Sequence, residues 1–295
     1  MAHPQIAAFA RLAEGGTPPN RKIEGQSTLL GRTMHAIAYD EIHDEVVVPQ
    51  QFAQAVLTFR GGASGEEPPV RVIQGSLTQL EQLDQLAIDP VHNEIFVPER
   101  DHVLVFSRLA NGNVAPIRVL KGPDAFRSAA TVAVDPVHNL LLVTGTPPGA
   151  GEQPRGAGAG IMIFDRTAQG NVKPKAVISG PNVSLSGGNA RIYAYPPREL
   201  FLVVATQPGG SGGGSTGPTA GVPVDGSGQM ASNRGFVGVW SIHDQGDVPP
   251  RWKIGGPDGM LLAIRGVALD PKHKTVIISD KRLNALLTYS FPEIF

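Results

Sequence analysis

The segment LAIDPVHNEIFVPERDHVLVFSRLANGNVAPIRVLKG, residues 86–122, decides the fold. It contains four short apolar runs separated by polar turns that hold Asp, Asn, Pro and Gly. Runs of this length, with a turn about every ten residues, are typical of antiparallel β-strands. We name the runs strands A, B, C and D: A and B lie within 86–97, C covers 103–106 and D covers 116–122.

The same pattern recurs along the chain with a period of roughly 47 to 50 residues. The A–B pair recurs at 37–48, 132–143, 192–203 and 267–278; strand C recurs at 55–59, 161–164, 237–240 and 285–290; and strand D ends in glycine at Gly75, Gly122, Gly180 and Gly256. The spacing lengthens where two insertions rich in Gly and Pro, 145–160 and 206–234, interrupt the third and fourth repeats. Their composition favours flexible loops.

Four antiparallel strands per repeat predict an all-β fold, a β-propeller of four-stranded blades that stack face to face. Five repeats are visible, and a sixth blade remains an alternative. We expect one domain over residues 1–295. Small side chains relieve crowding where the innermost strands converge, and one position of strand A accordingly holds Ala38, Ala87, Ala133 and Ala268, with Tyr193 as the exception.

The two ends of the chain carry incomplete repeats. The sequence IAAFAR at 6–11 resembles strand C, and NRKIEG at 20–25 resembles strand D. The last repeat stops after strand C at 285–290. We therefore expect 20–25 to pair with 285–290 and close the ring. The segment 6–11 is then either an outer fifth strand or the remnant of a blade whose strands A and B lie upstream.

Composition narrows the classes of function. A net charge of −1 gives no electrostatic basis for binding nucleic acid. The absence of cysteine excludes disulfides, thiolate metal sites and a cysteine nucleophile. Residues 1–5 lack the pattern of a signal peptide, and no apolar stretch is long enough for a membrane helix. We expect a soluble protein without membrane insertion.

The order DPVHN, EIFV, VLVF, the turn Asn111-Gly112-Asn113 and then APIRVLKG resembles bacterial NHL-type and lactonase-like propeller repeats, over nearly the whole chain. This resemblance implies an exported protein, extracellular or periplasmic. Members of these families include binding platforms, lyases and calcium-dependent hydrolases, so the fold implies no single chemistry.

Four histidines occupy equivalent positions: His43, His92, His138 and His273. Each follows an aspartate in the A–B turn, at Asp40, Asp89, Asp135 and Asp270. Equivalent positions on separate blades are too far apart to bind one ion at about 2 Å. Side-chain capping of the turn explains the aspartates. We therefore predict a structural role for these turns.

Polar residues that differ between repeats gather where strand A starts and strand B ends, which the connectivity places on one face. They are His35, Asp84, Gln85, Arg191 and Arg265 at the starts, and Gln50, Glu99, Arg100, Asp280 and Lys281 at the ends. We call this face the tunnel mouth, and propellers commonly bind ligands there. The predicted ligand-binding residues are His35, Gln85, Glu99, Arg100, Arg191, Arg265 and Asp280. A solvated surface of mutually compensating charges is the alternative.

Two functions fit this face. The first is non-enzymatic binding of a protein or a small polar ligand, without a cofactor. The second is a hydrolase or lyase in which His35 acts as base and arginines stabilise an oxyanion. Calcium held by Glu99, Asp84 and Asp280 would be opposed by the arginines at the same mouth. We expect the side chains of Arg191 and Arg265 to be exposed. Changing both to alanine is therefore expected to alter the free energy of unfolding by less than about 1 kcal/mol.

Deleting residues 1–26 tests the closure of the ring. The deletion removes the expected partner of 285–290 and exposes the edge of that strand, so the melting temperature should fall and self-association should increase. Deleting residues 1–4 alone is the control, measured by thermal unfolding and analytical ultracentrifugation. A chain lacking 1–26 that kept its melting temperature and stayed monomeric would contradict the pairing.

Overall fold

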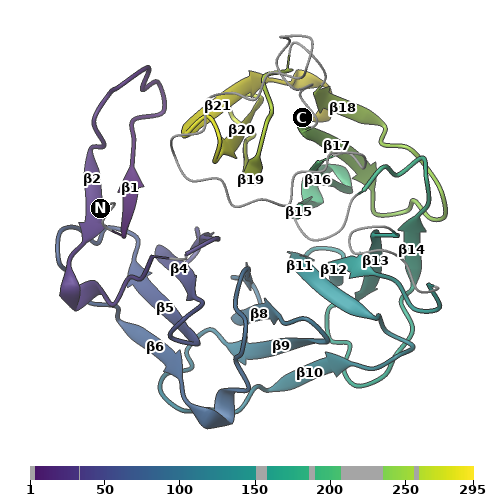
Figure 1. Ribbon diagram of the computed structural model, residues 1–295, viewed down its shortest axis with the longest axis horizontal. Coiled ribbons are helices and arrows are strands. Elements are labelled where there is room, and N and C mark those ends of the chain that lie inside the picture. The colour runs from purple at the N-terminus through teal and green to yellow at the C-terminus, as the bar shows by residue number, and fades with distance from the viewer. Residues whose placement is uncertain (1–3, 33, 151–157, 186–189, 207–234, 256–258) are drawn as a thin grey trace, which may run out of the picture. The chain divides into compact units, whose positions relative to one another are not determined.

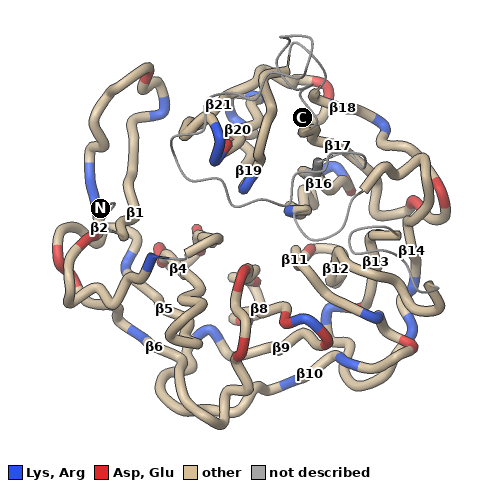
Figure 2. Tube along the Cα trace, in the orientation of Figure 1, with Lys and Arg blue, Asp and Glu red and all other residues tan. Residues whose placement is uncertain are grey.

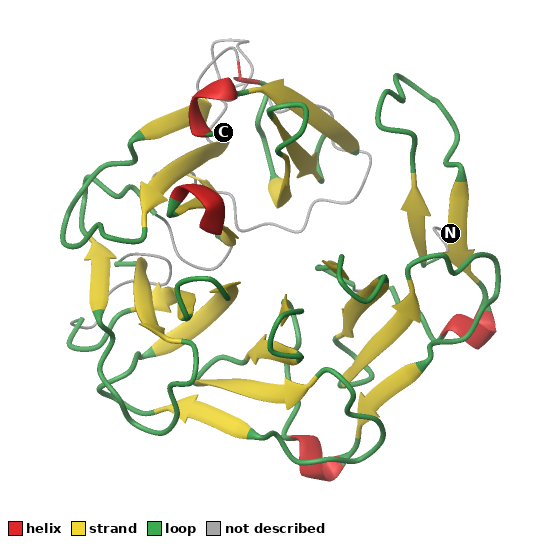
Figure 3. Cartoon of the chain, turned by 180° about the vertical axis from the view of Figure 1, so that it is seen from behind, coloured by secondary structure: helices red, strands yellow, loops and turns green. Residues whose placement is uncertain are grey.

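The computed structural model describes residues 4–32, 34–150, 158–185, 190–206, 235–255 and 259–295. These residues are mostly strand, and their only helical segments are single 3-10 turns such as Gln26–Thr28, Ser76–Thr78 and Pro292–Ile294 (Figure 3). The predicted all-β class is therefore confirmed for the described residues. Most of the two predicted insertions, namely 151–157 and 207–234, lies outside them.

The chain divides into two compact units, residues 1–119 and 120–295. In the first unit, β1 (Gln5–Ala8) pairs with β2 (Arg21–Glu24) in a two-stranded sheet. Two four-stranded sheets follow: β3 (Ala38–Asp40), β4 (Glu45–Gln50), β5 (Ala55–Arg60) and β6 (Arg71–Gln74), then β7 (Ala87–Asp89), β8 (Glu94–Pro98), β9 (His102–Ser107) and β10 (Arg118–Lys121). Strand β10 contains the boundary between the units.

The second unit continues the same order of strands (Figure 1). Its four-stranded sheets are β11 (Ser128–Asp135), β12 (Leu140–Thr146), β13 (Gly160–Asp165) and β14 (Ala176–Ser179), then β15 (Arg191–Tyr195), β16 (Leu200–Thr206), β17 (Gly235–Ser241) and β18 (Trp252–Gly255). A three-stranded sheet follows, with β19 (Ile264–Asp270), β20 (Thr275–Asp280) and β21 (Ala285–Ser290).

All five repeats have the A, B, C order of a propeller blade, and four of them add strand D, which confirms the predicted fold class. The pairing of 20–25 with 285–290 would join the two units, and it stays a prediction. So does the single domain over 1–295.

Each A–B turn has the same register. The last residue of strand A pairs with the first residue of strand B, and four residues lie between them, as with Asp40 and Glu45 or Asp89 and Glu94. The last of the four adopts a left-handed backbone conformation in every repeat, at Asp44, Asn93, Asn139, Glu199 and Lys274. Asn and Asp tolerate this conformation better than most residues, which explains their frequency here.

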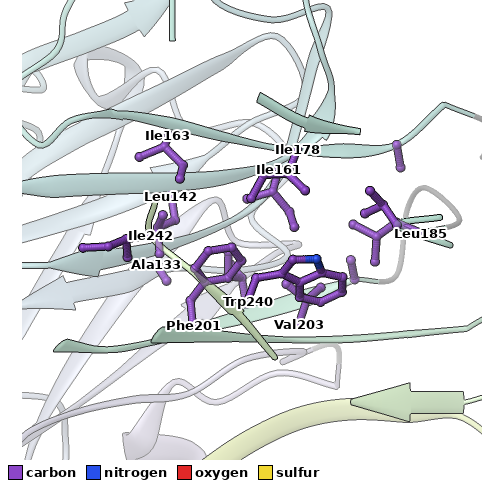
Figure 4. Packing of buried hydrophobic residues seen from close by; sticks show 14 of the residues in the cluster. Ala133, Leu142, Ile161, Ile163, Ile178, Leu185, Phe201, Val203, Trp240 and Ile242 are labelled. Atoms are coloured by element: carbon purple, nitrogen blue, oxygen red, sulfur yellow. The ribbon is translucent and has the colours of Figure 1, made fainter. Parts of the chain in front are cut away.

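Successive sheets within a unit share an apolar layer. In the second unit, Leu142 and Ile161 from one sheet pack with Phe201, Val203 and Trp240 from the next (Figure 4). The Phe201 and Trp240 rings are stacked, with centroids 6.2 Å apart. In the first four repeats, strands B and C are covered on both faces, so they are almost continuously apolar. In the fifth repeat, β20 and β21 instead alternate between less and more exposed positions.

Four strands D, namely β2, β6, β10 and β14, are each bound by the C–D turn of the next repeat. A glycine of that turn forms a parallel bridge with strand D, in the pairs Ile23–Gly65, Ile73–Gly112, Leu120–Gly170 and Ile178–Gly246. The residue after this glycine accepts a hydrogen bond from a backbone N–H just beyond strand D. The bonds run from Ser27 to Glu66 (3.1 Å), Leu77 to Asn113 (2.8 Å), Asp124 to Asn171 (2.8 Å) and Asn182 to Asp247 (2.8 Å). We call this arrangement the inter-repeat latch.

The latch explains why strand D ends in glycine. Gly75 has a φ of +129°, which side chains rarely tolerate, and a Cβ there would lie 2.5 Å from Asn113 Cγ. The other latch glycines also have positive φ and lie against the side chain of the next turn; they are Gly25, Gly122 and Gly180. Backbone conformation and contact with the next repeat thus both require glycine.

Replacing Gly75 with alanine should destabilise the protein by about 1–3 kcal/mol, from backbone strain and collision with Asn113. Asn113→Ala should cost about 1 kcal/mol through the lost hydrogen bond. The double variant should lose less than the sum, because removing Asn113 Cγ and Oδ1 relieves the closest part of the collision, although Asn113 Cβ remains 2.8 Å away. Urea unfolding measures all three. Gly16→Ala, where an added Cβ meets no atom within 4 Å, is the control, and strictly additive losses would contradict the latch.

Candidate functional site

The Asp–His turns are structural, as predicted. The aspartate accepts the backbone N–H of the histidine and contacts its ring Nδ1, at 2.9 and 2.8 Å for Asp89 and His92. The same two contacts hold His43, His138 and His273 to the aspartate three residues earlier. Each ring therefore closes its own turn, which confirms the capping role.

At the starts of strands A, the structure brings His35 and Asp84 together. The two residues lie just before β3 and β7, in adjacent repeats of the first unit, and His35 Nδ1 contacts Asp84 Oδ1. Both side chains remain about 40% exposed, at 42% and 37%. The sequence placed these residues on one face, and this contact confirms it for the pair.

Glu99, at the end of strand B in the second repeat, is buried and binds backbone. Its Oε1 accepts the N–H of Glu81 at 3.0 Å, and its Oε2 accepts the N–H of Gln82 at 2.7 Å. Burial raises the pKa of the Glu99 carboxyl, although these N–H groups and nearby His102 act in the opposite direction. The carboxyl thus fixes the D–A connection of its own repeat.

Asp280 does the same in the fifth repeat, at the equivalent position. Its Oδ2 accepts the N–H groups of Leu262 and Ala263 at 2.8 and 2.9 Å, and its Oδ1 accepts those of Arg282 and Leu283 at 2.9 and 3.1 Å. Sequence reasoning missed this anchoring role. The available signal was an acidic residue at the end of strand B facing a long D–A connection.

The remaining predicted residues differ in exposure. Arg100 is exposed and Gln85 is buried. Arg265 falls at a register shift between Ile264 and Gly266, which leaves it outside the pairing with β20. Such bulges re-aim a side chain. Arg191 is only 3% exposed, so the expectation that it behaves as an exposed residue is wrong: it lies in β15, where it pairs with Val204 of β16.

The predicted residues are distributed over both units. His35, Gln85, Glu99 and Arg100 belong to the first, and Arg191, Arg265 and Asp280 belong to the second. Their grouping around one tunnel mouth, and their binding of a ligand, therefore stay predictions. Acidic and basic residues are both distributed along the two units (Figure 2).

A charged network joins the first two repeats on the face of the A–B turns. Arg108 donates to Glu45 Oε2 at 2.7 Å and to Asn93 Oδ1 at 2.8 Å, and Arg71 also contacts Glu45. Arg71 further donates to the Arg108 carbonyl at 3.1 Å. Glu45 has a lowered pKa: burial opposes ionisation, but the two guanidinium groups outweigh it. This network was not predicted.

No metal-binding arrangement is found in the described part of the chain, where no three His, Cys, Asp or Glu side chains converge suitably. The same part of the chain has no helix long and apolar enough to cross a membrane.

No family model and no curated protein sequence matches the chain. Solved structures resemble its fold. Hydrazine synthase of Kuenenia stuttgartiensis is similar with a TM-score of 0.57 and 12% identity, over 94% of this chain and 68% of that one. The β-propeller domain of Cps50 (Swd1) from Myceliophteria thermophila has a TM-score of 0.50 and 10% identity, over 88% and 66%. At these identities the likeness shows the β-propeller fold alone.

The raised pKa of Glu99 makes its effect on stability depend on pH. The folded state favours the protonated carboxyl, so the stabilisation is fully present below the unfolded pKa and is lost as pH rises through the folded pKa. Relative to Glu99→Gln, the wild-type protein should therefore lose free energy of unfolding between about pH 4 and pH 7. Urea unfolding at both pH values measures the difference. A wild type that gained free energy of unfolding relative to Glu99→Gln as the pH rose would contradict a raised pKa of Glu99.

Proposed function

We propose that this chain is a non-enzymatic binding propeller that recognises a protein or a small polar ligand on the face where strand A starts and strand B ends. The observation that carries the proposal is the anchoring of the D–A connections by the buried carboxyls Glu99 and Asp280. Connections held in this way present their neighbours at fixed positions, which lowers the entropic cost of binding.

The exposed groups on this face suit a polar ligand. In the first unit, His35 and Asp84 form a partly exposed pair, and Arg100 is exposed beside the anchored Glu99. An imidazole, a carboxylate and a guanidinium together supply hydrogen-bond donors and acceptors, and groups of both positive and negative charge. Such a set favours a ligand that itself carries both a positive and a negative charge, or several hydroxyl groups.

A hydrolase or lyase is the second candidate, because two features resemble catalytic groups. Asp84 can orient the His35 imidazole as a base, and Glu99 is a buried carboxyl with a raised pKa. Against this, both Glu99 oxygens already accept backbone hydrogen bonds. We therefore rank binding first. Membership of the NHL-type propellers, and export from a bacterial cell, belong to the same proposal.

Variants of the exposed residues test the proposal. His35→Ala and Arg100→Ala should each change stability by less than about 1 kcal/mol, as at exposed sites. Each should weaken binding about tenfold or more for polar ligands found in a thermal-shift screen of amino acids, sugars and dicarboxylates. His92→Ala, on the face of the A–B turns, is the matched control.

Ligands lost on changing His92 but retained by the His35 and Arg100 variants would place binding on the other face. Turnover of a screened ester or lactone that is abolished by His35→Ala would favour the enzymatic candidate instead.

A further inference from the structure

The junction between the third and fourth repeats departs from the charged network of the first two. The network residues Glu45, Arg71 and Arg108 correspond in the repeat to Leu140, Ala176 and Ile242. Three charged residues are thus replaced by three apolar ones, and both arginines by shorter side chains. All three replacements lie in the second unit.

The shorter side chains leave a groove of about 260 Å³ at this junction. Leu140, Ile163 and Ile242 line it and are at most 8% exposed. His138, Lys175 and His243 also line it, and their side chains are 28%, 54% and 67% exposed. The groove therefore combines an apolar floor with a nitrogen-bearing edge.

A carboxylate already lies between the two imidazoles. Glu199 Oε2 is 3.1 Å from His243 Nε2, and Glu199 Oε1 is 3.5 Å from His138 Nε2. His138 is held in place through Nδ1 by Asp135, at 2.8 Å. The Nε2 atoms of the two imidazoles therefore share one carboxylate, while Asp135 fixes the His138 ring through Nδ1.

The resident ion pairs at the edge are weak enough to exchange. Glu199 is 52% exposed, and Lys175 pairs with Asp165 at 2.6 Å with both side chains more than half exposed. Exposed ion pairs contribute roughly 0–1 kcal/mol. A ligand carboxylate that takes the place of Glu199 loses little by displacing it, and an attached apolar chain gains contact with the floor.

We propose that this groove binds a small carboxylate with an apolar chain of about four to six carbon atoms, a size suited to a cavity below the range of drug-sized pockets. The carboxylate lies against His138, His243 and Lys175, and the chain lies on Leu140, Ile163 and Ile242. The site is on the face of the A–B turns and is independent of the function proposed above.

Calorimetric titration with sodium hexanoate tests the site. The wild-type chain should bind hexanoate with a dissociation constant on the order of 1 mM. Hexylamine and 1-hexanol should bind at least tenfold more weakly, because they lack the carboxylate. Glu199→Gln, an exposed change that removes the competing charge, should tighten hexanoate binding about threefold or more.

A triple variant, Leu140→Glu, Ala176→Arg and Ile242→Arg, rebuilds the network of the first junction and should abolish binding. Glu41→Gln, an exposed change in the A–B turn of the first repeat, is the control for Glu199→Gln and should leave hexanoate binding unchanged. Absence of hexanoate binding would overturn the proposal. Equal binding of hexylamine, or hexanoate binding that Glu199→Gln leaves unchanged, would overturn the role of the imidazole pair.

Discussion

Four strands D end in a glycine with positive φ that lies against the C–D turn of the next repeat. The order of the sheets depends on this contact. The turn supplies a glycine for the parallel bridge and, one residue later, an oxygen for a free N–H. Apolar packing alone would let neighbouring sheets slide, because it is non-directional. The latch fixes their register with directed hydrogen bonds, and the apolar layer then has one arrangement to fill.

Much of the fold could be predicted because the same pattern of strands and turns occurs in five repeats. The strands at 37–48 and 86–97 were placed to within about two residues, and those at 132–143 extend to Ser128 and Thr146 in the structure. The role of the Asp–His turns also followed from local chemistry. The contact of His35 with Asp84 was predictable only as a shared face, since which side chains meet depends on distances between repeats that no single repeat encodes.

The wrong expectation about Arg191 has a physical cause as well. Arg191 reads as a polar residue at a strand start, yet it is buried, because burial depends on the neighbouring sheet and not on residue type. That Glu99 and Asp280 bind a ligand stays a prediction, and what the sequence did not show is that their oxygens accept backbone N–H groups. Sequence shows that a carboxylate is present, and only the backbone path shows whether its hydrogen bonds are already made. Positions where the repeat changes, such as Leu140 and Ile242, are therefore more informative about function than those where it is regular.

The latch also has a direction along the chain, and this bears on how the protein emerges from the ribosome. In each case the acceptor lies C-terminal to the strand it secures, by 36 residues for Leu77 and Asn113 and by 65 for Asn182 and Asp247. A repeat that has just been synthesised therefore has a complete sheet but an unsecured edge until the next turn follows. Because domains begin to fold N-terminal first during synthesis, the earlier repeats are secured in sequence. The third repeat, whose strand D is followed by its latch acceptor after the longest span, is the last of these to be fixed.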